Sequence, residues 1–126
     1  LATALARKHL PRHATLHALR SQVARVEASG NPYEDLFTAV RVAPRSWMAD
    51  VAAFSFRNLI ERLEAGDVPS DRPFRNIQEG MPESQLDKAW IGLQRARIRL
   101  IQNLGSEELA AVIPLYDRVR ELLPPL

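Results

Sequence analysis

The chain has 126 residues, of which 46% are hydrophobic and 25% are charged, so its composition excludes a disordered or low-complexity chain. Seventeen basic residues nearly balance fifteen acidic ones and leave a net charge of +2, which excludes a chain dominated by charge of one sign. The sequence has no Cys, which excludes disulfide bonds, a thiol nucleophile and zinc bound by Cys. This length predicts one domain over residues 1–126.

The sequence also gives an expectation of the cellular location of the protein. No apolar run approaches the roughly 20 residues that a membrane-spanning helix needs, and the first residues lack the pattern of a signal peptide. We therefore expect a cytoplasmic protein. The chain starts without Met and ends in the segment 122–126, which is rich in Leu and Pro. We expect it to be one domain of a longer protein.

Two helices are predicted before residue 30. A short helix over residues 1–10 ends at Pro11, because Pro disfavours helical geometry at the residue before it. A second helix covers about residues 12–29 and ends at Gly30. Apolar residues spaced by three and four positions give it one apolar face: Leu16, Leu19, Val23 and Val26.

A third helix is predicted to begin after Asn31. Asn31 can cap it, Pro32 suits its first turn, and Glu34 stands where the carboxylate of a capping box belongs. Pro44 ends this helix.

A fourth helix, over about residues 47–65, is predicted to be capped by Ser46 and to end at Gly66. Its main apolar face is Met48, Ala52, Phe56, Leu59, Ile60 and Leu63. The residues that follow, 66–82, hold three Pro and two Gly and are predicted to form a long internal loop.

A fifth helix covers about residues 83–104 and ends at Gly105, and Ser106 is predicted to cap a last helix. Pro114 lies inside the apolar pattern of that last helix, so we expect it to kink or divide the helix. The main face of the fifth helix is Leu86, Ala89, Trp90, Leu93, Ala96, Leu100 and Leu104.

These patterns predict an all-α fold. No segment alternates apolar and polar residues as a strand would, and the five Gly residues are expected at the boundaries of helices. The predicted architecture is a compact helical bundle of four main helices plus one or two short helices.

The three histidines are four residues apart: His9, His13 and His17. His13 and His17 have the spacing that lets two imidazoles on one helix bind the same metal ion. Their neighbours in the sequence are basic rather than acidic, which disfavours a cation. Exposed histidines without a metal are the alternative, and we expect no metal and no cofactor.

The densest basic run is residues 94–99. Arg95 and Arg99 share a face of the fifth helix, and they could contact phosphates of a nucleic acid. The alternative is a solvated face with an arginine that pairs with an acid or lies over an aromatic ring. Aromatic residues make up only 6% of the chain, so nucleic-acid binding is the weaker interpretation.

Nothing in the sequence indicates catalysis. The carboxylates are scattered, and no phosphate-binding Gly-rich loop, nucleophile elbow or catalytic triad pattern is present. We therefore expect a protein that is not an enzyme and has no catalytic residues.

A second apolar stripe distinguishes the fifth helix: Ile91, Ile98 and Ile101. One apolar face is enough for a helix in a simple bundle, so the second needs its own cover. Either another part of the chain, such as the loop over residues 66–82, or a partner molecule supplies it. The candidate interaction surface is Trp90, Ile91, Arg95, Ile98, Arg99 and Ile101.

The order of the helices resembles that of the DinB-like metal-binding four-helix bundles. Residues 47–54 look like the start of the second helix of that family, and residues 106–109 are similar to a turn common after its third helix. Phe54 stands where the family has a metal-binding His, and the His expected on the last helix is missing. The resemblance implies a metal-binding bundle with atypical ligands, and it assigns no ligand here.

The sequence thus favours a protein-interaction or regulatory domain that offers apolar helix surface and arginines to a protein partner or to a second copy of itself. A DinB-like metal-binding bundle and an arginine-based nucleic-acid-binding domain are the alternatives.

Overall fold

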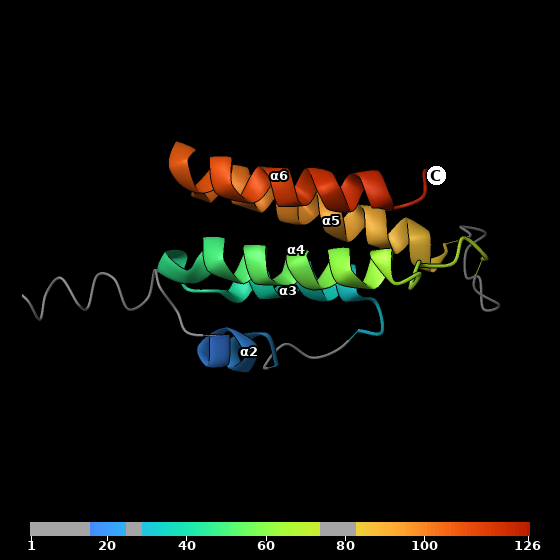
Figure 1. Cartoon of the computed structure of the whole chain (residues 1–126), viewed down its shortest axis with the longest axis horizontal. Coiled ribbons are helices and arrows are strands. Elements are labelled where there is room, and N and C mark those ends of the chain that lie inside the picture. The colour runs from blue at the N-terminus through green and yellow to red at the C-terminus, as the bar shows by residue number, and fades with distance from the viewer. Residues whose placement is uncertain (1–15, 25–28, 74–82) are drawn as a thin grey trace, which may run out of the picture.

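The computed structural model describes residues 16–24, 29–73 and 83–126. The elements are α2 (Leu16–Ala24), α3 (Pro32–Val42), the 3-10 helix η1 (Arg45–Trp47), α4 (Met48–Glu64), α5 (Gln85–Asn103) and α6 (Ser106–Leu122). No strand occurs in the described ranges. The predicted all-α bundle of four main helices with short additional ones is confirmed (Figure 1).

The four long helices form two layers (Figure 1). In that view α6 lies in front of α5, and α4 lies in front of α3. The most extensive contacts join α3 to α5 and α4 to α6, while α3 also packs on α4 and α2 packs on α4. The short helix α2 therefore covers the side of the bundle opposite α5 and α6.

Both extensive pairs run parallel. The α3/α5 pair places the start of α3 at Tyr33 beside Gly92, and the end of α3 at Arg41 beside Arg99. The α4/α6 pair is likewise parallel, because its contacts advance along both helices in the same direction, from the Phe56–Tyr116 ring contact to the ion pair of Glu64 with Arg118.

This arrangement accounts for the long connection between α4 and α5. Consecutive helices joined by short loops pack as antiparallel neighbours, as α3 and α4 do. In contrast, α4 and α5 belong to different parallel pairs, and the described residues give them no extensive contact. Residues 65–84 therefore join helices at opposite corners of the bundle.

The α3/α5 pair is close because of Gly92. A Cβ atom on Gly92 would lie 2.5 Å from the carbonyl oxygen of Tyr33, inside van der Waals contact. Only a residue without a side chain allows this approach. The prediction that every Gly marks a boundary is thus wrong at position 92, which lies inside α5.

The core lies between the four long helices, and the apolar faces predicted for α4 and α5 form most of it. Its largest fully buried side chains include Phe56, Leu36, Met48, Leu93 and Leu100. A second cluster lies under α2 and consists of Ala39, Ala43 and Val51, with Leu19, Val23 and Trp47 packed against it.

The start of α3 is capped as predicted, but without the capping box. The Asn31 side chain accepts hydrogen bonds from the backbone N–H groups of Tyr33 and Glu34. The Asn31 N–H donates to the Ser29 hydroxyl at 3.2 Å, so it does not need the Glu34 carboxylate. Glu34 instead lies 4.0 Å from the Lys88 ammonium on α5.

Two other predicted caps are wrong. Ser46 does not cap α4, because residues 45–47 form η1 and no side chain caps the N-terminus of α4. Ser106 is the first residue of α6 rather than its cap, and the cap position is Gly105, whose N–H donates to the Glu108 carboxylate at 3.2 Å.

Pro114 does not divide the last helix, which runs unbroken over Ser106–Leu122. Buried residues on both sides of Pro114, among them Val112 and Tyr116, hold the two halves of α6 on the core, and this packing outweighs the lost backbone hydrogen bond.

The predicted Gly stop of α4 is confirmed at Gly66, whereas residues 25–28, which precede the predicted stop at Gly30, lie outside the described residues. Gly30 has φ +87° and Gly66 has φ +91°. At the end of α4 the N–H groups of Gly66 and Asp67 donate to the carbonyls of Leu63 and Arg62, which satisfies the last turn. The predicted helix over residues 1–10 lies outside the described residues, as does His13.

Candidate interaction surface

The outer side of α5 carries exposed isoleucines. Ile91 is 43% exposed, Ile98 is 50% exposed and Ile101 is 43% exposed. We call these three residues the isoleucine stripe. The core side of the same helix carries Leu93 and Leu100, which are fully buried. No described part of the chain covers the stripe, and this includes the described residues of the loop over 66–82.

The charge on α5 is of one sign beyond its first turn. Asp87 is its last acidic residue, and Arg95, Arg97 and Arg99 follow in its C-terminal half. Because α3 runs parallel to α5, the end of α3 with Arg41 comes to the same end of the bundle. Three of these arginines, Arg41, Arg95 and Arg99, therefore lie together beside Ile98.

The acidic residues of these two helices lie at the other end: Glu34, Asp35 and Asp87 are all in first turns. Acids near a helix N-terminus and bases near its C-terminus complement the helix dipoles, so part of this separation stabilises α3 and α5 themselves. Its consequence is that the C-terminal halves of α3 and α5 carry no acidic residue.

A shallow depression of about 300 Å³ lies in this region. We call it the α3/α5 depression, and its lining residues are Phe37, Arg41, Arg95, Ile98, Arg99 and Gln102. Two helices contribute to it, with Phe37 and Arg41 from α3 and the rest from α5. Its apolar part is the Phe37 ring and the Ile98 side chain, and guanidinium groups surround that part.

Each of two arginines in the depression also contacts α3. The Arg95 guanidinium lies over the Phe37 ring, 5.9 Å from its centre. The Arg99 guanidinium donates to the carbonyl oxygen of Arg41 at 3.5 Å, where the last turn of α3 leaves carbonyls unpaired. The Nε atom of Arg99 is buried and has no hydrogen-bond partner among the described residues.

Trp90 and Arg97 face α6 rather than the isoleucine stripe. The Trp90 indole Nε1 donates to the carbonyl oxygen of Pro124 at 2.9 Å and holds the chain that follows α6. The Arg97 guanidinium lies 5.7 Å from the centre of the Tyr116 ring, which Arg120 also approaches, at 6.0 Å. Trp90 therefore has a structural role within the chain.

The structure thus brings together three of the six residues of the predicted interaction surface in the α3/α5 depression, Arg95, Ile98 and Arg99, while Ile91 and Ile101 are exposed elsewhere on the same helix. It adds residues that the sequence did not indicate. These are Phe37, Arg41 and Gln102, and also Val42, which is 51% exposed at the end of α3.

The predicted histidine pair is not placed as a pair. His17 is exposed on α2, whereas His13 lies outside the described residues. Among the residues that the structure describes, no group of three or more His, Cys, Asp or Glu side chains could hold a metal ion.

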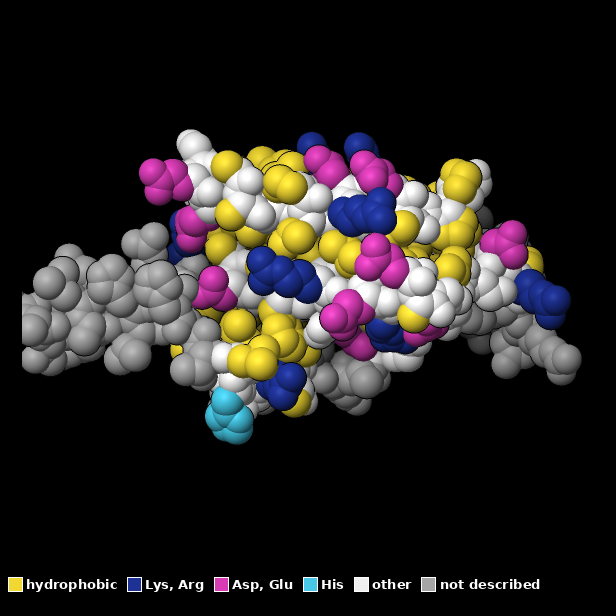
Figure 2. All heavy atoms as spheres, in the orientation of Figure 1, with side chains coloured by type: hydrophobic (Ala, Val, Ile, Leu, Met, Phe, Trp, Pro, Cys, Tyr) yellow, Lys and Arg dark blue, Asp and Glu magenta, His cyan; other side chains and the backbone are white. Residues whose placement is uncertain are grey.

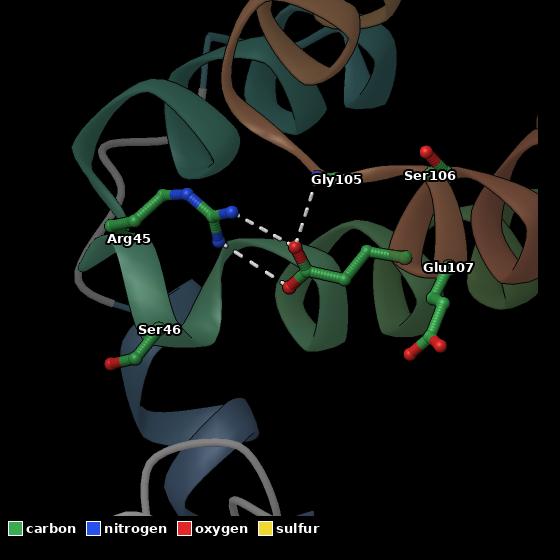
Figure 3. Close-up of a pocket in the computed structure, with 6 residues that line it drawn as sticks. Arg45, Ser46, Gly105, Ser106 and Glu107 are labelled. Atoms are coloured by element: carbon green, nitrogen blue, oxygen red, sulfur yellow. Dashed lines mark hydrogen bonds and ion pairs between the residues drawn. The ribbon is translucent and has the colours of Figure 1, made fainter.

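A larger depression lies where the starts of α4 and α6 meet (Figure 3). Arg45 donates to both carboxylate oxygens of Glu108, at 3.3 and 2.9 Å, and Glu108 also accepts from the Gly105 N–H. The Ser46 and Glu107 side chains point away from this pair in Figure 3. The polar groups at its centre are thus already paired within the fold, so we do not consider it a ligand site.

The face formed by α4 and α6 has a different charge pattern from that of α5. Acidic and basic side chains are interspersed on it, with apolar side chains between them (Figure 2). Arg118 pairs with Glu64 and with Glu121, and Arg120 pairs with Asp117. Arg118 and Arg120 are therefore paired with carboxylates within the chain.

None of the described helices is long and apolar enough to cross a membrane. No family model, no curated protein and no solved structure matches the chain. The resemblance to the DinB-like bundles therefore depends on the sequence pattern alone.

Proposed function

We propose that this bundle is a non-enzymatic interaction or regulatory domain that binds a protein partner through the outer side of α5. The observation that carries the proposal is the isoleucine stripe, whose three side chains are each 43 to 50% exposed on a helix without acids after Asp87. Single exposed apolar residues are common, but an exposed apolar group along one helix is typical of an interaction site.

The arginines support a protein partner in a second way. Arginine is enriched at protein interfaces, where its guanidinium pairs with carboxylates and its stem packs on apolar groups. Nucleic acid is the competing partner for the same arginines, but phosphate contacts give no role to the isoleucines between them. A cytoplasmic location and the absence of a cofactor belong to this proposal, and the cysteine-free, motif-poor sequence fits both.

Photocrosslinking tests the proposal directly. A photoreactive phenylalanine analogue replaces Ile91 or Ile101 in the chain, which is then irradiated in its native cells, and the crosslinked products are identified by mass spectrometry. We expect one defined protein to crosslink from both positions. The same analogue at Ala110, which is exposed on α6, is the control and is expected not to capture that protein.

A substitution then tests whether the stripe drives the binding. Ile98→Asp is expected to abolish the crosslinks from Ile91 and Ile101, because it puts a charge at the centre of the stripe. Val68→Asp is the matched control, since Val68 is also β-branched and is 42% exposed outside α5. Equal crosslinking from Ala110 and Ile101, or products that contain only nucleic acid, would contradict the proposal.

A further inference from the structure

We infer that the α3/α5 depression binds an acidic amphipathic segment of the partner protein, with one apolar side chain of that segment on Phe37 and Ile98 and its carboxylates on the surrounding arginines. This inference deepens the proposed function and rests on it. The partner is then an acidic segment, and it binds mainly in the α3/α5 depression rather than along the isoleucine stripe alone.

The shape of the depression indicates a side chain rather than a free small molecule. Its volume is about 300 Å³, at the lower end for ligand pockets, and it is open to solvent. The Phe37 ring is partly buried and packs on the core, so it is a fixed apolar floor. Ile98 forms one wall and is half exposed. A leucine or phenylalanine presented by a helix or strand would cover both side chains.

The charges around this floor lack counter-charges in the described chain. Arg41, Arg95 and Arg99 form no ion pair with any described carboxylate, whereas Arg118 and Arg120 of α6 do. A guanidinium can accept a carboxylate through two parallel hydrogen bonds while its flat face stays on an aromatic ring. Arg95 already lies over Phe37, so its N–H groups remain available at the edge of the depression.

The buried Nε of Arg99 is the second sign of incomplete pairing. A buried N–H donor without an acceptor is costly, and the side chain has only a long hydrogen bond of 3.5 Å to Arg41. A partner carboxylate at the rim would pair with the guanidinium of Arg99 as an opposite charge, although it would not reach the buried Nε itself. Carboxylates on both sides of an apolar anchor would therefore match the three guanidinium groups.

A second copy of this chain is a poor occupant. A twofold symmetric contact through this surface would place its arginines against the same arginines of the other copy, and like charges across an interface cost several kcal/mol. A lipid surface is also a poor match, because a planar bilayer cannot follow a depression between two helices. Charge complementarity thus points to an acidic protein segment.

Peptide selection tests the inference without a known partner. A random peptide library displayed on phage is selected against the purified chain, and the enriched peptides are synthesised with a fluorescent label. We expect peptides with net negative charge and an apolar residue beside Asp or Glu. Their affinity, measured by fluorescence anisotropy, is expected to fall about tenfold or more in Arg41→Gln/Arg95→Gln and to weaken with added salt.

Matched variants identify the site. Arg118→Gln removes a paired arginine from α6 and is expected to leave peptide affinity unchanged. Arg95→Glu is expected to lose the acidic peptides and to gain binding of the same peptide with Lys in place of its acidic residue. Circular dichroism and urea denaturation establish that each variant is folded.

The outcomes separate this inference from the proposed function. Enriched peptides that are neutral or basic, yet lose binding in Ile98→Asp, would overturn the acidic partner and leave the interaction role standing. Binding that neither Ile98→Asp nor the arginine variants change would overturn both. Binding to anionic vesicles or duplex DNA that depends on Arg41 and Arg95, with no acidic peptide enriched, would replace the protein segment by that polyanion.

Discussion

The two parallel helix pairs of this bundle are held together in different ways. In the α3/α5 pair, the absence of a side chain at Gly92 brings the helix to the backbone of Tyr33. In the α4/α6 pair, large side chains fill the space, and the Phe56 and Tyr116 rings meet edge to face with their centres 6.2 Å apart. The α3/α5 pair thus depends on close backbone approach, and the α4/α6 pair depends on aromatic packing.

The surfaces of the two pairs differ as well. On α4 and α6 several exposed charges form ion pairs within the chain, as Arg118 does with Glu64. On α5 the exposed charges have one sign and stand among exposed isoleucines. The comparison teaches that α6 pairs two of its outer arginines within the chain, whereas Arg41, Arg95 and Arg99 of the α3/α5 pair form no ion pair with a described carboxylate.

Phe56→Ala is expected to give the largest loss of stability. Phe56 is fully buried, and its removal leaves a cavity between α4 and α6, at a cost of about 3–5 kcal/mol. The free energy of unfolding from urea denaturation measures it. Phe54→Ala, at a partly exposed position on the same helix, is the control and is expected to cost clearly less. Equal losses would show that the α4/α6 pair does not depend on the aromatic contact.

Gly92→Ala is the corresponding test for the α3/α5 pair. In an ordinary helix this change would stabilise by about 1 kcal/mol, because Ala is the better helix former. Here the new methyl group would meet three backbone atoms of Tyr33 and Glu34 at 2.5 to 3.0 Å, and backbone atoms cannot swing aside. We expect a net loss of about 1–3 kcal/mol in urea denaturation.

Gly105→Ala is the matched control for Gly92→Ala. Its Cβ would meet only a side-chain oxygen of Glu108, at 3.9 Å, so we expect a change below about 1 kcal/mol. A Gly92→Ala variant as stable as the original chain would mean that α3 and α5 move apart freely, and the account of the pair by close approach would be wrong.

A pH titration tests the buried start of α3. Burial raises the pKa of Tyr33 from 10.0 to about 12, with Asp67 adding to the rise and Arg62 opposing it. Since the unfolded chain loses this proton first, the stability that depends on the neutral hydroxyl is complete below pH 10. It is lost as the pH rises from 10 towards 12.

Tyr33→Phe isolates this effect from other groups that titrate in alkali. We expect the free energy of unfolding of the original chain to fall more steeply between pH 10 and 12 than that of Tyr33→Phe. The difference between the two denaturation series is the measurement. Parallel curves would show that Tyr33 ionises as easily in the folded chain as in the unfolded one.

Local signals in the sequence gave most of the helix boundaries. Gly66 ends α4 because the last turn needs a residue with positive φ, and Asn31 starts α3 because its side chain reaches the N–H groups of the first turn. The exposed second stripe on α5 was also predictable, since apolar residues recur there at helical spacing on the side away from Leu93 and Leu100. Each of these features depends on residues within a few positions of one another.

The features that the sequence did not predict depend on contacts between residues far apart in the chain. The sequence could not indicate that α3 and α5 run parallel, and it therefore missed Phe37 and Arg41, which this arrangement brings to Ile98. The sequence assigned Trp90 to the surface. Its hydrogen bond to Pro124, 34 positions away, could not be foreseen from local spacing. In the same way Glu34 was assigned to a cap although Lys88 of α5 lies opposite it. Tertiary packing overrides local preference at these positions.

The smallest effect on stability is expected from Ile98→Asp, and it is the most informative one for function. Half of the Ile98 side chain is already exposed, and a carboxylate at this position lies near Arg95 and Arg99, which offsets the lost apolar contact. We expect the free energy of unfolding to change by no more than about 0.5 kcal/mol.

Leu100→Asp, two positions further along α5, is the matched control for this prediction. Leu100 is fully buried, so an Asp there is expected to prevent folding or to cost several kcal/mol, of the order given by buried charge. A loss of more than about 2 kcal/mol in Ile98→Asp would mean that another part of the chain covers the stripe, since core substitutions have effects of this size. A near-neutral result would show that folding does not require an isoleucine at this position, as the proposed docking role expects.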